Sequence, residues 1–105
     1  MKYFADREIW KAIAHAGEGG QSLHTHRIIA NRAKAPRCFI REVEQGRDIA
    51  HLFDLDLGRL IRTAERLGVR VINVERPSTP RQHIDLCGAP LRRALAECEA
   101  EEPKS

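Results

Sequence analysis

The chain has 105 residues, of which 42% are hydrophobic and 31% are charged, and its formal net charge is +3. This length fits one domain, and no stretch approaches the roughly 18 consecutive apolar residues of a membrane span. An acidic residue within residues 1–6 comes too early for a signal peptide. The three cysteines form no Cys-x-x-Cys pair, which argues against a zinc ribbon. The sequence therefore predicts a small cytoplasmic domain without disulfides.

A strand and an amphipathic helix are expected at the start of the chain. Residues 2–5 are short and aromatic, which is typical of a strand. Asp6 then precedes a helical pattern that ends at Gly17, with Ile9 and Ile13 on its apolar side.

The next segment is less regular. Ser22 is a suitable N-cap residue, so residues 22–35 predict a second helix, which Pro36 ends. Residues 38–43 predict a strand, and residues 44–48 predict a turn into the strand that follows.

Residues 49–75 carry the clearest pattern in the chain. A strand is expected at residues 49–53 and a β-branched strand at residues 69–75, with a helix between them that stops at Gly68. The apolar stripe of that helix consists of Leu57, Leu60, Ile61, Ala64 and Leu67. Strand, helix and strand with tight links predict a parallel βαβ unit, and apolar residues on both sides of the second strand predict that it is covered on both faces.

The chain is expected to end in a helix. Residues 76–81 predict a rigid loop, and residues 82–86 an extended or turn-like segment. Pro90 suits the first helical position. The expected buried face of this helix consists of Leu91, Ala94, Leu95 and Cys98. The sequence therefore predicts one α/β domain over residues 1–101, with a mixed sheet, helices packed on it and a frayed end at residues 102–105.

Polar residues follow the predicted strands. If these strands are parallel, their carboxyl ends bring together Asp6, Asp54 or Asp56, and Glu75 or Arg76. The loop that leaves this edge adds four candidate ligand-binding residues, which are Arg76, Arg81, His83 and Asp85. Arginines suit a phosphate, and carboxylates with a histidine suit a divalent metal ion. The predicted metal ligands are Asp6, His83 and Asp85.

Each candidate also has a purely structural interpretation. Asp6, and either Asp54 or Asp56, are also suitable helix caps, and His51 alternates with apolar residues as a hydrogen-bonded core histidine does. His51 and Asp54 are therefore secondary candidates. His83 and Asp85 are two residues apart, so in an extended segment their side chains point the same way, and their structural alternative is a surface turn.

A basic segment and a pair of histidines are two further candidate ligand-binding features. Residues 27–47 hold six basic and two acidic residues, which suits nucleic acid or an ordinary solvated surface, and no aromatic stacking stripe accompanies them. His24 and His26 form a His-x-His pair, which can bind metal at a strand end; in the helix or loop expected here they do not face each other.

Several short motifs resemble a family of short bacterial α/β proteins that is known only as a domain of unknown function. The matching segments are the His51-Leu52 strand, the leucine-rich helix that ends Leu67-Gly68, and residues 83–86, which read His-Ile-Asp-Leu. The resemblance covers mainly residues 49–97. The family has a histidine where Ile61 stands, a tyrosine where Ile84 stands and a shorter segment in place of residues 17–46. The resemblance implies an α/β architecture and no particular activity.

Three functions follow from these patterns. The first is a binding domain for a phosphate-rich ligand, either a nucleotide or nucleic acid. The second is a small metal-dependent hydrolase or nuclease that uses Asp6, His83 and Asp85. The third is a protein-interaction or dimerisation module, because a small core gains from burial in a homo-oligomer.

Overall fold

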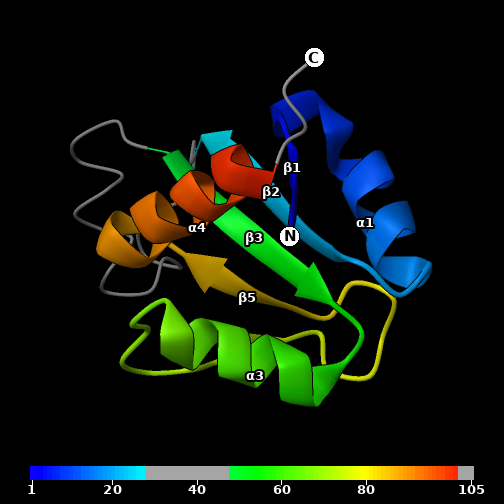
Figure 1. The fold of residues 1–105 in the computed structure, drawn as a ribbon. Coiled ribbons are helices and arrows are strands. Elements are labelled where there is room, and N and C mark those ends of the chain that lie inside the picture. The colour runs from blue at the N-terminus through cyan, green and yellow to red at the C-terminus, as the bar shows by residue number, and fades with distance from the viewer. Residues whose placement is uncertain (28–47, 102–105) are drawn as a thin grey trace.

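The computed structural model describes residues 1–27 and 48–101, which form a mixed five-stranded sheet with helices on both faces (Figure 1). In their order across the sheet, the strands are β1 (Lys2–Phe4), β2 (Gln21–Arg27), β3 (Asp48–Asp54), β5 (His83–Leu86) and β4 (Val74–Glu75). β1 and β2 are parallel, and every other neighbouring pair is antiparallel. The predicted α/β class and mixed sheet are confirmed.

The parallel pair is formed by the first two strands and the helix that connects them. After β1, a 3-10 turn (Asp6–Glu8) leads into α1 (Ile9–Gly17), and the backbone N–H of Ala5 donates to the Glu8 carboxylate at 3.0 Å. α1 then returns the chain to β2, so β1, α1 and β2 make a parallel βαβ unit. The strand and helix predicted at the start of the chain are confirmed.

The helix predicted over residues 22–35 is wrong in its described part, because residues 22–27 belong to β2. Side chains of this segment alternate between the two faces of the sheet, as they do in a strand. Leu23 is fully buried in the larger core, while Ser22 and His24 are buried on the opposite face. Each of these polar side chains contacts a backbone carbonyl: the Ser22 hydroxyl donates to the Ala12 carbonyl at 2.7 Å, and His24 Nε2 lies 2.9 Å from the Asp6 carbonyl. The remaining expectations for residues 28–47, including the basic cluster, lie outside the described residues.

The unit predicted over residues 49–75 is only partly correct. β3 and α3 (Leu57–Arg66) are present, Asp56 caps α3 by accepting the Arg59 N–H at 3.0 Å, and Gly68 follows with a φ of 87°. β3 and β4 run in the same direction, but β5 lies between them and is antiparallel to both. The expected parallel neighbours are therefore wrong.

The strand predicted over residues 69–75 is shortened to Val74–Glu75. Val71 has 82% of its surface exposed, so this segment is not covered on both faces as its apolar residues suggested. The predicted loop over residues 76–81 and the extended segment after it are confirmed, the latter as β5.

The larger core lies between the sheet and two helices, α3 and α4 (Gly88–Glu101). Its buried members are Leu23, Ala50, Leu52, Leu60, Ala64, Leu67, Ile84, Leu86, Leu91, Ala94 and Cys98. They include three of the four residues expected on the buried face of the last helix, and Leu95 packs against them partly buried. This layer anchors β3 and β5 from one side. None of the described helices has the length and apolar character needed to cross a membrane.

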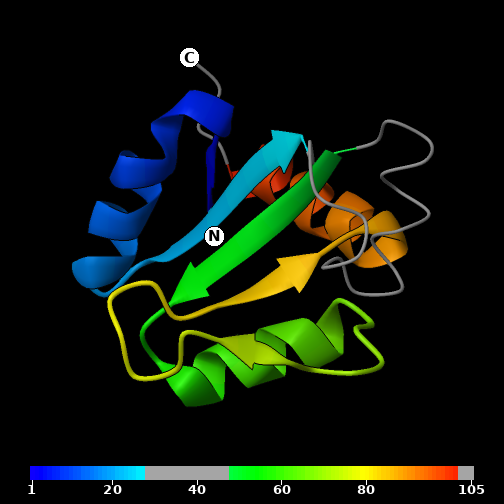
Figure 2. The ribbon, with the colours of Figure 1, turned by 180° about the vertical axis from the view of Figure 1, so that it is seen from behind.

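The opposite face of the sheet carries α1 and a smaller core of Phe4, Ala12, Ala16 and Phe53. Figure 2 shows α1 beside β1 and β2, while β3 and β5 face the viewer without a described helix in front of them. Within residues 1–27 and 48–101, α1 covers Phe53 near the end of β3, and no helix lies over the remaining part of this face on β3, β5 and β4, which is referred to here as open. The side chains on that open part form the candidate site.

Candidate functional site

Three ionisable side chains meet on the open face of β3 and β5. His51 is the ladder partner of Asp85, and Phe53 is the ladder partner of His83. Directly paired residues project from the same face of an antiparallel sheet, and so do residues two apart on one strand. β5 therefore buries Ile84 and Leu86 in the larger core and presents His83 and Asp85, half-buried, on the other side.

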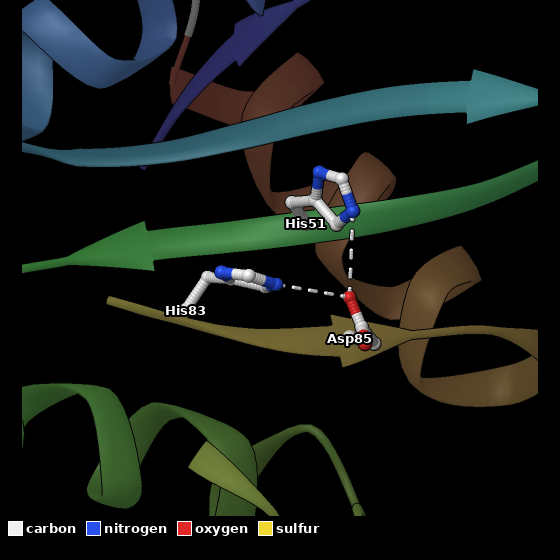
Figure 3. A group of neighbouring side chains, drawn as sticks. All are labelled: His51, His83 and Asp85. Atoms are coloured by element: carbon white, nitrogen blue, oxygen red, sulfur yellow. Dashed lines mark ion pairs between the residues drawn. The ribbon is translucent and has the colours of Figure 1, made fainter. Parts of the chain in front are cut away.

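The side chains of His51, His83 and Asp85 converge on one point (Figure 3). Asp85 Oδ1 lies 3.5 Å from Nε2 of His51 and 3.4 Å from Nε2 of His83. One nitrogen or oxygen of each residue lies within 4.8 Å of the other two. The same carboxylate oxygen is buried and accepts no hydrogen bond within the described part of the chain. Two imidazoles and a carboxylate are thus directed at a common volume.

The tautomer of His83 follows from its second contact. Its Nδ1 lies 2.7 Å from the Arg81 carbonyl, and a carbonyl only accepts, so Nδ1 carries the proton. In the neutral ring, Nε2 therefore presents its lone pair to Asp85. Burial lowers the pKa of His83, but Asp85, the Arg81 carbonyl and the charge of Glu75 outweigh it and raise the pKa above its ordinary value. The position next to Nε2 favours a positive charge, either a proton or a metal ion.

A hollow of about 210 Å³ opens beside these residues. It is lined by Ile9, Trp10, Ile13, His51, Phe53, Arg76, Arg81 and His83, and we refer to it below as the α1 hollow. α1 contributes an apolar wall, the two strands contribute the floor, and the loop between β4 and β5 contributes two arginines. The guanidinium of Arg81 lies over the Trp10 ring, 5.0 Å from its centroid.

The loop that carries both arginines is fixed by its own hydrogen bonds. The Thr79 hydroxyl donates to the Arg76 carbonyl at 2.7 Å, and the buried Gln82 accepts from the Ser78 N–H at 2.9 Å. Gln82 also donates to the Asp54 carbonyl at 2.9 Å, which ties the loop to the end of β3. These bonds hold Arg76 and Ser78 in left-handed conformations, with φ of 53° and 62°, that non-glycine residues rarely adopt.

Asp54 has a structural role. Its carboxylate is fully buried and accepts two hydrogen bonds from Arg59, each 2.7 Å long. It also accepts from Gln21 at 2.9 Å and from the Asp56 N–H at 2.9 Å. These partners join the start of α3 to β2, so the secondary candidate Asp54 is not part of the cluster. The alternative interpretation as a capping region is confirmed for Asp56.

The structure separates Asp6 from the other predicted metal ligands. β1 is an edge strand, separated from β3 by β2 and antiparallel to β3 in direction, and the carboxylate of Asp6 is not in the cluster. Asp6 is also not a cap, because Ala5 occupies that position. His51, a secondary candidate, takes the place expected for Asp6. Of the predicted ligand-binding residues, Arg76, Arg81 and His83 line the hollow, and Asp85 does not line it but lies 3.4 Å from His83.

Sequence reasoning missed the contribution of Trp10 and Phe53, which line the hollow. Glu75, which was expected at a strand end, is the ladder partner of His83, so its side chain projects from the same face. The packing of α1 on the sheet and the register of β4, β5 and β3 determine these proximities, and no sequence signal gives either. His24 stacks on His51 with ring centroids 5.7 Å apart and supports the cluster from β2. The side chain of His26 lies outside what the structure describes.

No protein-family model, curated protein or solved structure matches this chain. The resemblance to an uncharacterised bacterial family therefore stays a prediction.

Proposed function

We propose that this protein is a small metal-dependent hydrolase whose metal ligands are His51, His83 and Asp85. The ion would be a divalent transition metal such as Zn²⁺, because two imidazoles and one carboxylate are a common donor set for a zinc ion that keeps an open position for water. This proposal keeps His83 and Asp85 from the sequence hypothesis and replaces Asp6 with His51.

The observation that carries the proposal is the spacing of the donor atoms. Ligands bound at about 2.1 Å in a tetrahedral site lie about 3.4 Å from one another. The two distances from Asp85 Oδ1 to the histidine nitrogens, 3.4 and 3.5 Å, match this edge. They exceed the roughly 2.7–2.9 Å of charge-assisted hydrogen bonds between such groups. The spacing therefore fits a shared ion better than a direct hydrogen-bonded triad.

The surrounding contacts also suit a metal centre. His83 donates its other ring N–H to the Arg81 carbonyl, which is the usual way in which a protein orients a ligating histidine. A bound ion would supply Lewis acidity that brings the pKa of a coordinated water to about 7. Glu75 projects from the same face opposite His83, and it would accept the proton of that water as general base.

Metal binding is the first test. Zn²⁺ titration of the metal-free protein, followed by calorimetry, should give one site per chain. His51→Ala, His83→Ala and Asp85→Asn should each weaken binding by more than the roughly 10–100-fold that loss of an outer-shell partner costs. Asp6→Asn is the matched control and should bind Zn²⁺ as the unchanged protein does. Equal affinity in Asp85→Asn would remove this carboxylate from the site and overturn the proposal.

Hydrolysis is the second test. Turnover of p-nitrophenyl phosphate and of bis(p-nitrophenyl) phosphate should require Zn²⁺ or Mn²⁺. Glu75→Gln should lower kcat by about 10²–10⁴-fold, the usual contribution of a general base, while Zn²⁺ affinity is retained. Loss of kcat together with loss of metal would instead assign Glu75 to the metal site.

A second candidate function is the binding of a phosphate-rich ligand without hydrolysis. The observation in its favour is the pair of arginines, since the described part of the chain offers neither Arg76 nor Arg81 an ion-pair partner. In that case a phosphate-bearing ligand would bind to the protein and would remain intact in the presence of Zn²⁺ or Mn²⁺.

A further inference from the structure

The α1 hollow has a basic side and an apolar side, and this combination suits a particular class of ligand. Arg76 and Arg81 stand on one side, and the wall from α1 presents Ile9, Trp10 and Ile13. The floor is formed by His51 and His83, two of the three proposed metal ligands, together with Phe53. A ligand that satisfies all of these surfaces has an anionic group beside the metal centre and a flat apolar group against α1.

We propose that the α1 hollow binds the phosphate monoester of a nucleoside, with the phosphate between Arg76 and Arg81 and the base against Trp10. For its chemistry this inference rests on the proposed metal centre, but for binding it does not. Hydrolysis of such a monoester would break the ester P–O bond and join the oxygen of water to phosphorus. One proton of that water would go to the leaving nucleoside hydroxyl, and the other would stay on the inorganic phosphate.

The two arginines would bind the phosphate. Guanidinium groups present several donors in a planar fork that matches the oxygens of a phosphate. The hydrogen bonds of Thr79 and Gln82 fix the loop backbone before any ligand arrives. The guanidinium of Arg81 also lies over the exposed Trp10 ring, 5.0 Å from its centroid. Little conformational freedom of the loop backbone is then lost on binding, which favours affinity.

Trp10 would provide the surface for the base. It has 67% of its surface exposed, which is unusual for a residue so large, and it stands at the mouth of the hollow. Aromatic side chains exposed beside basic groups are the usual platform for a nucleobase. The hollow of about 210 Å³ is smaller than the roughly 300–1,000 Å³ of most ligand sites, so a nucleotide would lie partly outside it, with its base against Trp10 at the mouth.

Binding of adenosine 5′-monophosphate to metal-free protein in a chelator tests the proposal, with calorimetry as the readout. Saturable binding is expected. Arg76→Gln and Arg81→Gln should each weaken it by about tenfold or more, as expected for loss of a charged hydrogen-bond donor. Arg92→Gln is the matched control: Arg92 is an exposed arginine of α4, on the other side of the sheet, and the variant should bind like the unchanged protein.

Two smaller probes separate the halves of the ligand. Ribose 5-phosphate should bind about tenfold more weakly than the nucleotide, and in Trp10→Ala the two should bind alike, because the base has then lost its stacking surface. Adenosine should bind equally to the unchanged protein and to Arg76→Gln. Circular dichroism of each variant establishes that the fold is retained, which is expected because Trp10, Arg76 and Arg81 are all exposed.

The outcomes are distinct from those of the metal proposal. Absence of saturable nucleotide binding, or unchanged affinity in both arginine variants, would overturn the nucleotide proposal whatever the result with Zn²⁺. Nucleotide binding to a protein that takes no Zn²⁺ would overturn the hydrolase and leave this inference standing. Binding of the nucleotide that does not depend on Trp10 would overturn the assignment of the base and leave a phosphate site only.

Discussion

At the scale of single residues, His83 is the group on which the site depends most directly. One ring nitrogen is committed to the Arg81 carbonyl, so the second takes either a proton or a metal ion. The negative charges of Asp85 and Glu75 favour either occupant, and burial opposes the charge. Proton and metal therefore compete for one atom.

This competition predicts how the stability of the metal-free protein depends on pH. The pKa of His83 in the folded protein is raised above its ordinary value of 6.5. The protonated ring therefore stabilises the fold fully below that value, and the contribution is lost as pH rises through the higher folded-state pKa. Urea unfolding in a chelator should show this loss, and His83→Gln should remove it. Identical pH profiles for the two proteins would contradict the assigned environment of His83.

Metal binding should show the opposite pH dependence. Since Zn²⁺ binds only the deprotonated ring, its affinity should fall as pH drops below the pKa of His83, and binding at lower pH should release a proton. Calorimetric titration in buffers of different ionisation enthalpy measures the protons released. Release that does not vary with pH would show that no imidazole with a raised pKa ligates the ion.

Asp54 makes a different kind of contribution, to stability alone. Its buried carboxylate binds the partly exposed Arg59 and the side chain of Gln21. Asp54→Ala should lower the free energy of unfolding by about 2–4 kcal/mol, because it removes several charged hydrogen bonds at once. Asp56→Ala, which removes only the cap of α3, should cost about 1 kcal/mol. Denaturant unfolding checks both, and Zn²⁺ affinity should change in neither variant.

At the scale of elements, substitution of the glycine after α3 and of the glycine at the end of α1 should affect stability differently. Gly68 has a φ of 87°, and a Cβ there would lie 2.3 Å from Nη1 of Arg93, which donates to the Leu67 carbonyl. Gly68→Ala should therefore cost about 1–2 kcal/mol of unfolding free energy. Gly17, at the end of α1, has open space around its Cβ position, so Gly17→Ala should be neutral or slightly stabilising. Equal effects in thermal unfolding would contradict this reading of the two turns.

The elements also show which parts of the fold a sequence can reveal. α3 was predictable because its apolar stripe, its cap at Asp56 and its stop at Gly68 all agree. β2 was missed because its inward-facing polar residues, Ser22 and His24, are buried through specific hydrogen bonds that a hydrophobic pattern does not register. A strand whose buried face is polar looks like a loop or a weak helix in a single sequence.

The sequence also revealed only part of the candidate site. That His83 and Asp85 share a face followed from their spacing alone. The contribution of His51 depended on β5 pairing with β3 in the register that places His51 opposite Asp85, and this pairing arises from tertiary packing. Asp6 was assigned to the site on the assumption that β1 and β3 are parallel, which the antiparallel pairing of β2 and β3 overturns.

At the scale of the whole molecule, the sheet separates two cores of unequal size. The core beneath α3 and α4 contains several fully buried leucines and supports β3 and β5 from behind. The core beneath α1 is smaller, and the helix contributes only alanines to its fully buried part. The candidate site thus has a rigid floor, formed by the strands, and one wall that is held less firmly.

This asymmetry predicts where the protein opens first. Local opening free energies follow the amount of buried apolar contact, so amides of α1 should exchange with solvent faster than those of α3 and β3. A ligand in the α1 hollow contacts α1 and the strands together, and it should slow exchange in α1 more than in α4. Hydrogen–deuterium exchange with and without adenosine 5′-monophosphate measures both effects. Equally slow exchange in α1 and α3 without ligand would contradict the two-core description, and protection confined to α4 would move the ligand to the other face of the sheet.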